Sequence, residues 1–218
     1  MTEIIADVLP DNPYGVLTGP NLAREIMSGK AAASVIAMND NGLAEKVRDV
    51  FHSGVFRVYT NQDVIGCELG GILKNIIAIA VGMGIGLGAG DNTRSALITR
   101  GLAEISRLGV AMGGQQSTFS GLTGMGDLIA TCVSPLSRNY QVGVQLGEGR
   151  DIDTIIENMV MVAEGVKSAP TVIKLAEKFS VDMPIAQDVS KVVSGKKTAR
   201  QAFKGLLRAD IGSENDPG

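Results

Sequence analysis

Short apolar runs alternate with helical patterns over the first part of the chain. The runs that favour buried strands are residues 14–18, 33–37 and 56–60. The helical patterns around them are residues 2–9, about 21–28 and about 43–51. Strands that alternate with helices are typical of βαβ units, so this pattern predicts a mostly parallel three-stranded sheet.

From residue 62 onward the pattern is helical. Residues 67–81 read as a core helix that runs into a glycine loop, with glycine at every second position from Gly82 to Gly90. Further helical patterns begin at Asp91 and then cover residues 125–132, 137–147, 151–158, 164–178, 184–193 and 198–208. The chain is therefore expected to be α/β at its start and mainly α-helical afterwards.

These patterns predict three parts. Residues 1–61 are expected to form a partial Rossmann-like piece, the C-terminal part of a dinucleotide-binding domain. Residues 62–210 are expected to form an all-helical domain, and residues 211–218 a mobile tail. None of the three strand patterns carries the glycine fingerprint that opens a dinucleotide-binding fold. We therefore expect an N-terminal portion of that fold to lie outside this chain.

Lys74 is the only ionisable side chain between Glu68 and Asp91. An ammonium buried among apolar side chains is costly unless it is paired or gives up its proton. Lys74 is therefore a candidate for proton transfer. The alternative is a lysine whose apolar stem lies in the core while its head reaches the surface. The residues alone leave both open.

Composition narrows the classes of function. The chain has 218 residues, 44% hydrophobic and 20% charged, with a net charge of −3 and no Trp. This predicts a globular protein and argues against a nucleic-acid partner. Cys67, Cys132 and the single His52 give neither a zinc site nor a disulfide framework, so we expect no metal and a cytoplasmic compartment. The acidic N-terminus is not a signal peptide, and we interpret residues 69–90 as a buried helix, not a membrane span.

The glycine run also matches a relaxed dinucleotide-binding pattern at Gly84, Gly86 and Ala89. However, the apolar segment before it is too long for a typical strand. We interpret these glycines instead as positions where the backbone passes close to another backbone or to a ligand.

Three further segments offer polar chemistry. Gly19-Pro20-Asn21 joins a strand to a helix, where free N–H groups favour anions, although from the residues alone an ordinary Gly-Pro turn is the favoured explanation. Asp127 follows a glycine-rich loop and shares a helix face with Thr131. The alternative for Asp127 is a simple N-cap. The tripeptide Ser137-Arg138-Asn139 offers donors suited to a phosphate.

Taken together, these segments resemble the bacterial-type NAD(P)-dependent glycerol-3-phosphate dehydrogenases. The matching segments are Gly19–Glu25, Phe56–Tyr59, Glu68–Asn75, Asp91–Arg94, Thr99–Glu104, Gly124–Leu128, Ser137–Asn139, Glu164–Gly165 and Met183–Ile185. They follow the family's order and spacing over nearly the whole chain, and as a set they are specific.

The resemblance implies roles for individual residues. It makes Lys74 the catalytic base, which takes the proton from the C2 hydroxyl of glycerol 3-phosphate while hydride moves to NAD or NADP. In the direction of phospholipid synthesis, Lys74 would instead donate to the carbonyl of dihydroxyacetone phosphate. The implied substrate contacts are Lys74, Asp127, Thr131, Ser137, Arg138, Asn139, Gly19 and Asn21. The implied cofactor contacts are Ala23, Arg138, Val162 and Glu164.

The chain departs from the family's pattern in two ways. The glycine fingerprint and a second substrate-binding lysine fall before Met1, so we do not expect tight cofactor binding by these residues alone. Ile85 stands where the family commonly has an aspartate.

The preference between NAD and NADP is left open. A homodimer is the default expectation. The alternatives are another two-domain hydroxyacid or sugar-acid dehydrogenase, and an inactive truncated module.

Overall fold

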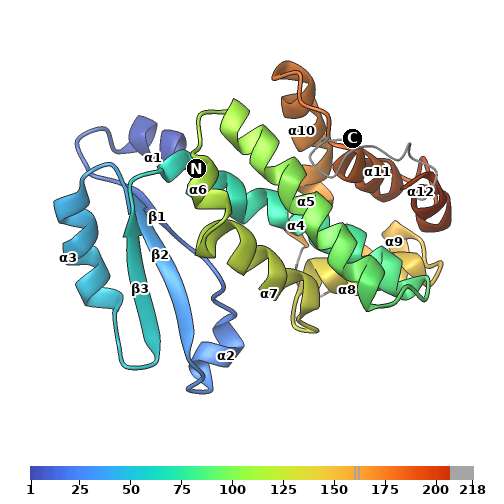
Figure 1. The fold of residues 1–218 in the computed structure, drawn as a ribbon, viewed down its shortest axis with the longest axis horizontal. Coiled ribbons are helices and arrows are strands. Elements are labelled where there is room, and N and C mark those ends of the chain that lie inside the picture. Colours follow the sequence, from blue (N-terminus) through green and yellow to red (C-terminus); the bar gives the residue numbers. More distant parts are fainter. Residues whose placement is uncertain (160, 162, 207–218) are drawn as a thin grey trace.

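The computed structural model describes residues 1–159, 161 and 163–206. The expected tail, residues 211–218, and residue Val162 therefore lie outside the described residues. The N-terminal piece consists of α1 (Thr2–Val8), β1 (Gly15–Thr18), α2 (Ala23–Met27), β2 (Ala32–Met38), α3 (Asn41–Phe51) and β3 (Phe56–Asn61). Figure 1 shows this piece on one side of a larger group of helices.

The three strands form one sheet in the order β1-β2-β3. β2 and β3 are parallel, with Ala32 opposite Phe56, and α3 packs against both strands, so β2-α3-β3 is the expected βαβ unit. β1 and β2 are antiparallel, with Gly15 opposite Met38, so the prediction of a mostly parallel sheet was wrong for this pair. The β1–β2 connection contains only the five-residue α2, which lies at the end of the sheet and not over its face (Figure 1). A parallel pair needs a crossover that covers the sheet.

The middle strand β2 is buried on both faces. Val35 and Ala37 pack with Val64 and Cys67, while Ile36 and Met38 pack on the other side in a cluster with Ala44 and Val58. Successive side chains of a strand point to opposite faces, so one apolar run supplies both clusters. The first of these clusters includes the start of α4 and thereby joins the sheet to the helical part.

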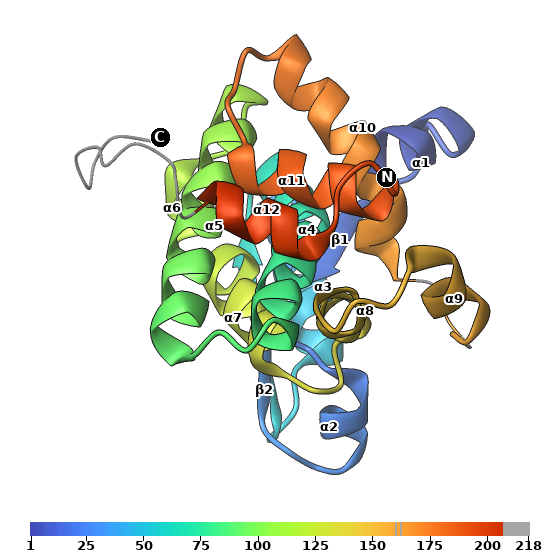
Figure 2. The same ribbon diagram turned by 90° about the vertical axis from the view of Figure 1, so that its right-hand side faces the viewer.

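The helical part surrounds α4 (Val64–Gly86). Its other elements are α5 (Asp91–Ala111), α6 (Gln116–Phe119), the π-helical turn η1 (Leu122–Gly126), α7 (Asp127–Val133), α8 (Arg138–Gly147), α9 (Ile152–Glu157), α10 (Glu164–Lys178), α11 (Pro184–Val193) and α12 (Ala199–Leu206). Figure 2 shows α4 enclosed by its neighbours, and the main hydrophobic core lies around it.

The glycines at residues 82, 84 and 86 belong to α4 and do not form a loop, so the expectation that the helix ends near residue 81 was wrong. A Cβ at Gly82 would lie 2.9 Å from the Cα of Gly143 on α8, and a Cβ at Gly147 would lie 2.8 Å from the Cα of Gly86. The two helices therefore meet backbone to backbone, as in small-residue helix pairs. This contact explains why glycine is kept in a helix despite its low helix propensity. It also excludes a dinucleotide-binding turn at these positions.

By length and composition α4 could cross a membrane, and 67% of its most apolar window is buried inside the protein. Its middle stretch is enclosed by α5, α8, α10 and α11, so it has the position of a core helix. The interpretation of residues 69–90 as a buried helix is therefore confirmed up to Gly86. Ile85, in the last turn of α4, is half-buried.

We predict that Gly143→Ala lowers the free energy of unfolding by about 1–3 kcal/mol, because the added methyl group would clash with the main chain of α4. Urea denaturation of the chain measures this change. Gly42→Ala in α3 is the matched control, because its Cβ would find only an ordinary contact at 3.4 Å. We expect Gly42→Ala to be neutral or slightly stabilising. Equal losses in both variants would contradict the close packing of α4 on α8.

Candidate active site

Lys74 lies on α4, and its ammonium donates to Oδ2 of Asp127, the first residue of α7. The side chain of Lys74 is 17% exposed and that of Asp127 is 5% exposed. The lysine therefore does not extend freely into water, which was the alternative left open by the sequence. A largely buried ion pair of this kind needs further hydrogen bonds to satisfy the remaining polar atoms.

Asp127 has those further partners. Thr131 lies one turn along α7, and its hydroxyl donates to the main-chain oxygen of Asp127 at 2.6 Å and lies 3.3 Å from Oδ1. The backbone of Gly19 also hydrogen-bonds to the carboxylate. Burial raises the pKa of Asp127 above its ordinary value, while Lys74, Thr131 and Gly19 oppose that rise. Thus three residues from three separate segments, Lys74, Thr131 and Gly19, converge on the carboxylate of Asp127.

The π-helical turn η1 delivers Asp127 to this position. A Cβ at Gly70 of α4 would lie 2.9 Å from the main-chain oxygen of Thr123, so the turn can approach α4 only because residue 70 is glycine. Gly124 lies still more tightly against the backbone of Phe119. Short π-helical turns are rare and are often found at functional sites. The glycine-rich loop predicted before Asp127 is therefore a wound turn packed between α4 and α6.

The tripeptide Ser137-Arg138-Asn139 opens α8. Ser137 is the N-cap, and its hydroxyl accepts the N–H of Tyr140 at 3.3 Å. Arg138 is exposed, and its guanidinium has no hydrogen bond or ion pair with any described residue. The side chain of Arg138 is therefore available to bind a ligand from solvent, whereas the hydroxyl of Ser137 already caps α8.

Asn139 belongs to a buried network that joins three helices. Its Nδ2 donates to Oδ1 of Asn75 at 2.9 Å, and its Oδ1 accepts the N–H of Gly165 at 2.9 Å. Asn75 in turn donates from its Nδ2 to the main-chain oxygen of Gly71 at 3.3 Å and lies 3.4 Å from Oε2 of Glu164. The network fixes the starts of α8 and α10 against α4, directly beside Lys74.

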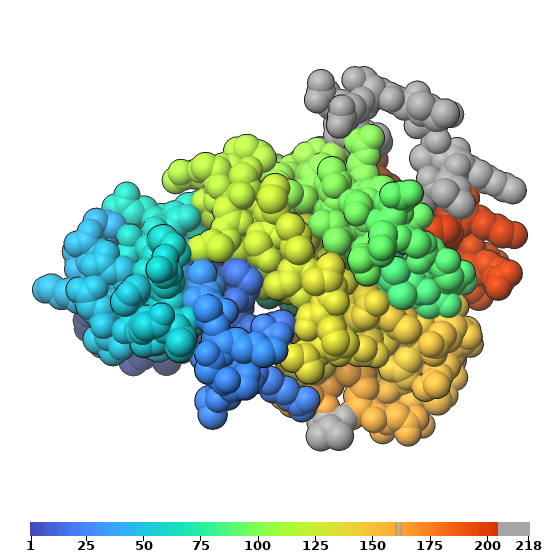
Figure 3. Space-filling view, turned by 60° about the horizontal axis from the view of Figure 1, so that its bottom comes forward, coloured from blue at the N-terminus to red at the C-terminus, as the bar shows by residue number. Residues whose placement is uncertain are grey.

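The segment after β1 lies at the edge of the site. Gly19 is buried with φ of +122°, a conformation that favours glycine. Asn21 donates its amide to Oγ of Ser34 at 3.2 Å, and Ala23 is an exposed residue at the start of the short helix α2. Figure 3 shows a hollow between the blue segment after β1 and the yellow segment of α7 and α8.

The structure thus brings Lys74, Asp127, Thr131 and Gly19 into direct contact. Asn139 and Glu164 join the site through Asn75. The described contacts of Asn21 lead to Ser34 instead. Sequence reasoning missed the part played by Asn75 and Gly165 and the π-helical turn. The place of Asn75 next to Lys74, inside a segment already singled out, was the one signal that could have indicated its role.

The two cysteines, Cys132 close to the pair and Cys67 beside Thr123, are buried and are poor nucleophiles. Burial raises the pKa of Cys132 to about 12 and that of Cys67 to about 11. The reactive form of cysteine is the thiolate, which burial disfavours here. Among the described residues, no three His, Cys, Asp or Glu side chains cluster in a way that could hold a metal ion. The chemistry available is that of a lysine–carboxylate pair.

Only part of a dinucleotide site is present in the described residues. The pyrophosphate of such a cofactor lies on a glycine turn between a first parallel strand and its helix, and the sheet described here begins with the antiparallel strand β1. Arg138 at the start of α8, Ala23 at the start of α2 and Glu164 at the start of α10 are exposed.

The fold and the site define a class: an α/β piece joined to a helical domain that holds a largely buried lysine–carboxylate pair suited to acid–base chemistry. The sequence profile described as NAD-dependent glycerol-3-phosphate dehydrogenase C-terminus matches residues 63–204. The profile of the N-terminus of the same enzymes matches residues 1–44. The chain therefore belongs to the NAD-dependent glycerol-3-phosphate dehydrogenase family.

Individual relatives agree with this assignment. Glycerol-3-phosphate dehydrogenase (NAD(P)+) 2 of Sphingopyxis alaskensis is 68% identical over 100% of this chain, which covers 66% of that relative. Glycerol-3-phosphate dehydrogenase (NAD(P)+) 1 of Mycobacterium bovis is 52% identical over 98% of the chain, which covers 63% of that relative. The chain thus spans slightly less than two thirds of these proteins.

A solved structure confirms the fold. The crystal structure of glycerol-3-phosphate dehydrogenase from Coxiella burnetii superposes with a TM-score of 0.91 at 39% identity, over 95% of this chain and 64% of that one. The expected fold class, a short α/β piece followed by a mainly helical domain, is therefore confirmed. The domain boundary at residue 61 stays a prediction.

We predict that Asn139→Ala lowers the free energy of unfolding by about 1–3 kcal/mol, because it leaves the buried Oδ1 of Asn75 and the N–H of Gly165 unpaired. Urea denaturation measures the loss. The control is Asn158→Ala, which removes an exposed amide bond to the main-chain oxygen of Thr154 and should cost less than about 0.5 kcal/mol. A similar small loss in both variants would show that the network does not hold the helices together.

Proposed function

We propose that this protein is an NAD(P)-dependent sn-glycerol-3-phosphate dehydrogenase, which interconverts dihydroxyacetone phosphate and glycerol 3-phosphate. The observation that carries the proposal is the contact between Lys74 on the central helix α4 and Asp127 on α7. The chain that holds this pair is 68% identical to a relative named as such a dehydrogenase. The phosphorylated substrate and the cofactor are taken from the names of the relatives. The lysine–carboxylate pair supplies the acid–base group that the reaction needs.

In the proposed reaction, Lys74 donates or accepts the proton, depending on the direction. When the ketone is reduced, hydride adds to the C2 carbon, the carbonyl π electrons move to oxygen, and that oxygen takes a proton from the ammonium of Lys74. In the opposite direction, Lys74 accepts the proton of the C2 hydroxyl as hydride leaves C2. The bound nicotinamide supplies or accepts the hydride. Asp127 aims the ammonium and offsets its charge, and Thr131 holds Asp127 in turn.

The remaining site residues are proposed to act around this pair. Arg138 is exposed and pairs with no residue that the structure describes, which supports its assignment to the substrate phosphate and to the cofactor. Ser137 and Asn139 set the start of α8 from which Arg138 projects, and Asn139 retains a second amide hydrogen for the substrate. Gly19 and Asn21 border the substrate. Ala23, Val162 and Glu164 are proposed for the cofactor, with Val162 outside the described residues.

A role in phospholipid synthesis, a cytoplasmic location and a homodimer are parts of the same proposal. Four exposed aliphatic side chains on the turn before α7, on α7 and just after it support a subunit interface: Met125, Ile129, Val133 and Leu136. Exposed apolar patches of this kind often mark such interfaces.

We predict that Lys74→Ala reduces kcat for dihydroxyacetone phosphate reduction by about 10²–10⁴-fold, the effect of losing a positioned acid–base group. The assay follows NADH or NADPH oxidation. It uses a chimera in which this chain is joined to the segment of the Sphingopyxis relative that it does not match. Lys174→Ala, which removes an exposed lysine of α10, is the control and should leave the rate unchanged. Near-full activity of Lys74→Ala in an active chimera would overturn the assignment.

We also predict that Arg138→Leu raises KM for dihydroxyacetone phosphate by about 10-fold or more while leaving the KM for unphosphorylated dihydroxyacetone unchanged, because a charge-assisted contact to phosphate contributes about 1.5–3 kcal/mol. Steady-state kinetics of the chimera compare the two substrates. Arg150→Leu removes an exposed arginine that follows α8 and serves as control. Equal changes for both substrates would instead favour a dehydrogenase whose substrate carries no phosphate.

A further inference from the structure

Thr18, the last residue of β1, has a hydroxyl that forms no hydrogen bond with any described residue. The residue is half-buried. Among the described side chains, the unpaired polar atoms that are sealed from solvent belong to Arg107 and Ser168. The hydroxyl of Thr18 can therefore be reached by a ligand.

The direction of β1 aims this hydroxyl at the catalytic helix. Val16 packs in a cluster with Cys67 of α4. Side chains two residues apart in a strand share a face, so Thr18 faces the same helix. Its Oγ1 lies 3.3 Å from the place where a Cβ at Gly71 would lie. The hydroxyl is thus held against α4 about one turn before Lys74.

The residues that follow Thr18 fix this end of the strand. The backbone of Gly19 hydrogen-bonds to the carboxylate of Asp127. The ring of Pro20 approaches η1, where a Cβ at Gly126 would lie 3.7 Å from its Cγ. Thr18 is therefore positioned by its main chain, and its hydroxyl is not needed for that purpose.

Other polar side chains beside the pair are already engaged. The amide of Asn21 donates to Oγ of Ser34, and the hydroxyl of Thr131 donates to the main-chain oxygen of Asp127. Thr18 differs from both residues because its hydroxyl keeps its donor and its acceptor positions for a ligand.

We propose that Thr18 is a further substrate-contacting residue, whose hydroxyl binds the C1 hydroxyl of dihydroxyacetone phosphate or glycerol 3-phosphate. The inference rests on the proposed function, in which Lys74 acts at C2 and Arg138 holds the phosphate on C3. The hydroxymethyl group at C1 then has no group assigned to it. Thr18 comes from β1 and Arg138 from α8, so the two residues hold different ends of the substrate.

Steady-state kinetics of the chimera with two substrates test this contact. Thr18→Val removes the hydroxyl at nearly constant volume and should raise KM for dihydroxyacetone phosphate about 5-fold, the effect of one neutral hydrogen bond. It should leave KM unchanged for hydroxyacetone phosphate, which lacks the C1 hydroxyl. Thr18→Ser keeps a hydroxyl and should restore the KM for dihydroxyacetone phosphate. Equal changes for both substrates, or no rescue by serine, would overturn the proposal.

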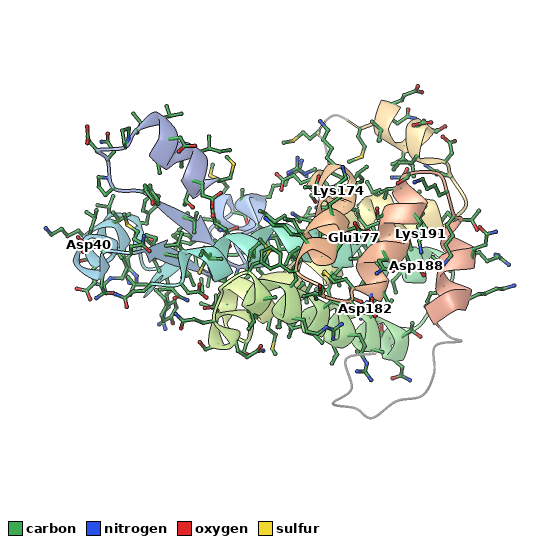
Figure 4. All side chains as sticks on the ribbon, turned by 90° about the horizontal axis from the view of Figure 1, so that it is seen from above. Asp40, Lys174, Glu177, Asp182, Asp188 and Lys191 are labelled. Carbon is green, nitrogen blue, oxygen red and sulfur yellow. The ribbon has the colours of Figure 1, made fainter. Side chains whose placement is uncertain are left out.

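Thr171→Val is the matched control. It removes an exposed hydroxyl from α10, the helix that carries Lys174 and Glu177 in Figure 4, on the helical side of the molecule. It should change neither KM. A rise like that of Thr18→Val would show that the effect does not come from a contact at β1.

Titration of the unaltered chain separates this proposal from the proposed function. Glycerol 3-phosphate should shift the NMR signals of the Thr18 methyl group and of the Arg138 guanidinium. Propane-1,2-diol 1-phosphate, which lacks the C1 hydroxyl, should shift the signal of Arg138 alone. A shift at Arg138 without one at Thr18 in both titrations would overturn the role of Thr18 and leave the proposed function standing. No shift at either residue would contradict both.

Discussion

The backbone contact between α4 and α8 determines where the helices that carry the proposed active site begin. Glycines on both helices let the main chains approach until no side chain fits between them. α8 then starts beside Lys74, where Asn139 can reach Asn75 and the start of α10. On another face of α4, Gly70 admits the π-helical turn that carries Asp127 to Lys74. Glycines therefore allow Asp127 to come within hydrogen-bonding distance of Lys74, the one lysine on this apolar helix.

Local patterns predicted much of the fold, because helices and strands depend on nearby residues. The three strands appear within two residues of their expected ends, and α10 and α11 have the expected bounds. Lys74 was recognisable from the residues alone, since one charge in an apolar stretch needs a reason to be there. Its pairing with Asp127, 53 residues away, was not recognisable in that way. Only the family resemblance suggested that Asp127, Thr131 and Arg138 belong to the same site.

The features that could not be predicted depend on long-range contacts. The helical state of Gly82–Gly86 is decided by packing against α8, which overrides the low propensity of glycine. The antiparallel direction of β1 depends on the position of α2 at the end of the sheet. The alternation of strands and helices along the sequence does not predict whether a helix covers the face of the sheet or lies at its end. The roles of Asn75 and Gly165 follow from partners on distant helices, although both residues stood inside segments matched to the family. Their neighbours in sequence do not reveal which groups they hold.

In the proposed reaction, Lys74 and Asp127 act as one unit in proton transfer. A double-mutant cycle measures this most directly, using kcat/KM for dihydroxyacetone phosphate reduction by the chimera with Lys74→Met, Asp127→Asn and both substitutions. If the two residues act together, the double variant will be about as slow as the slower single variant. Losses that multiply would show that the residues act independently and would contradict the account.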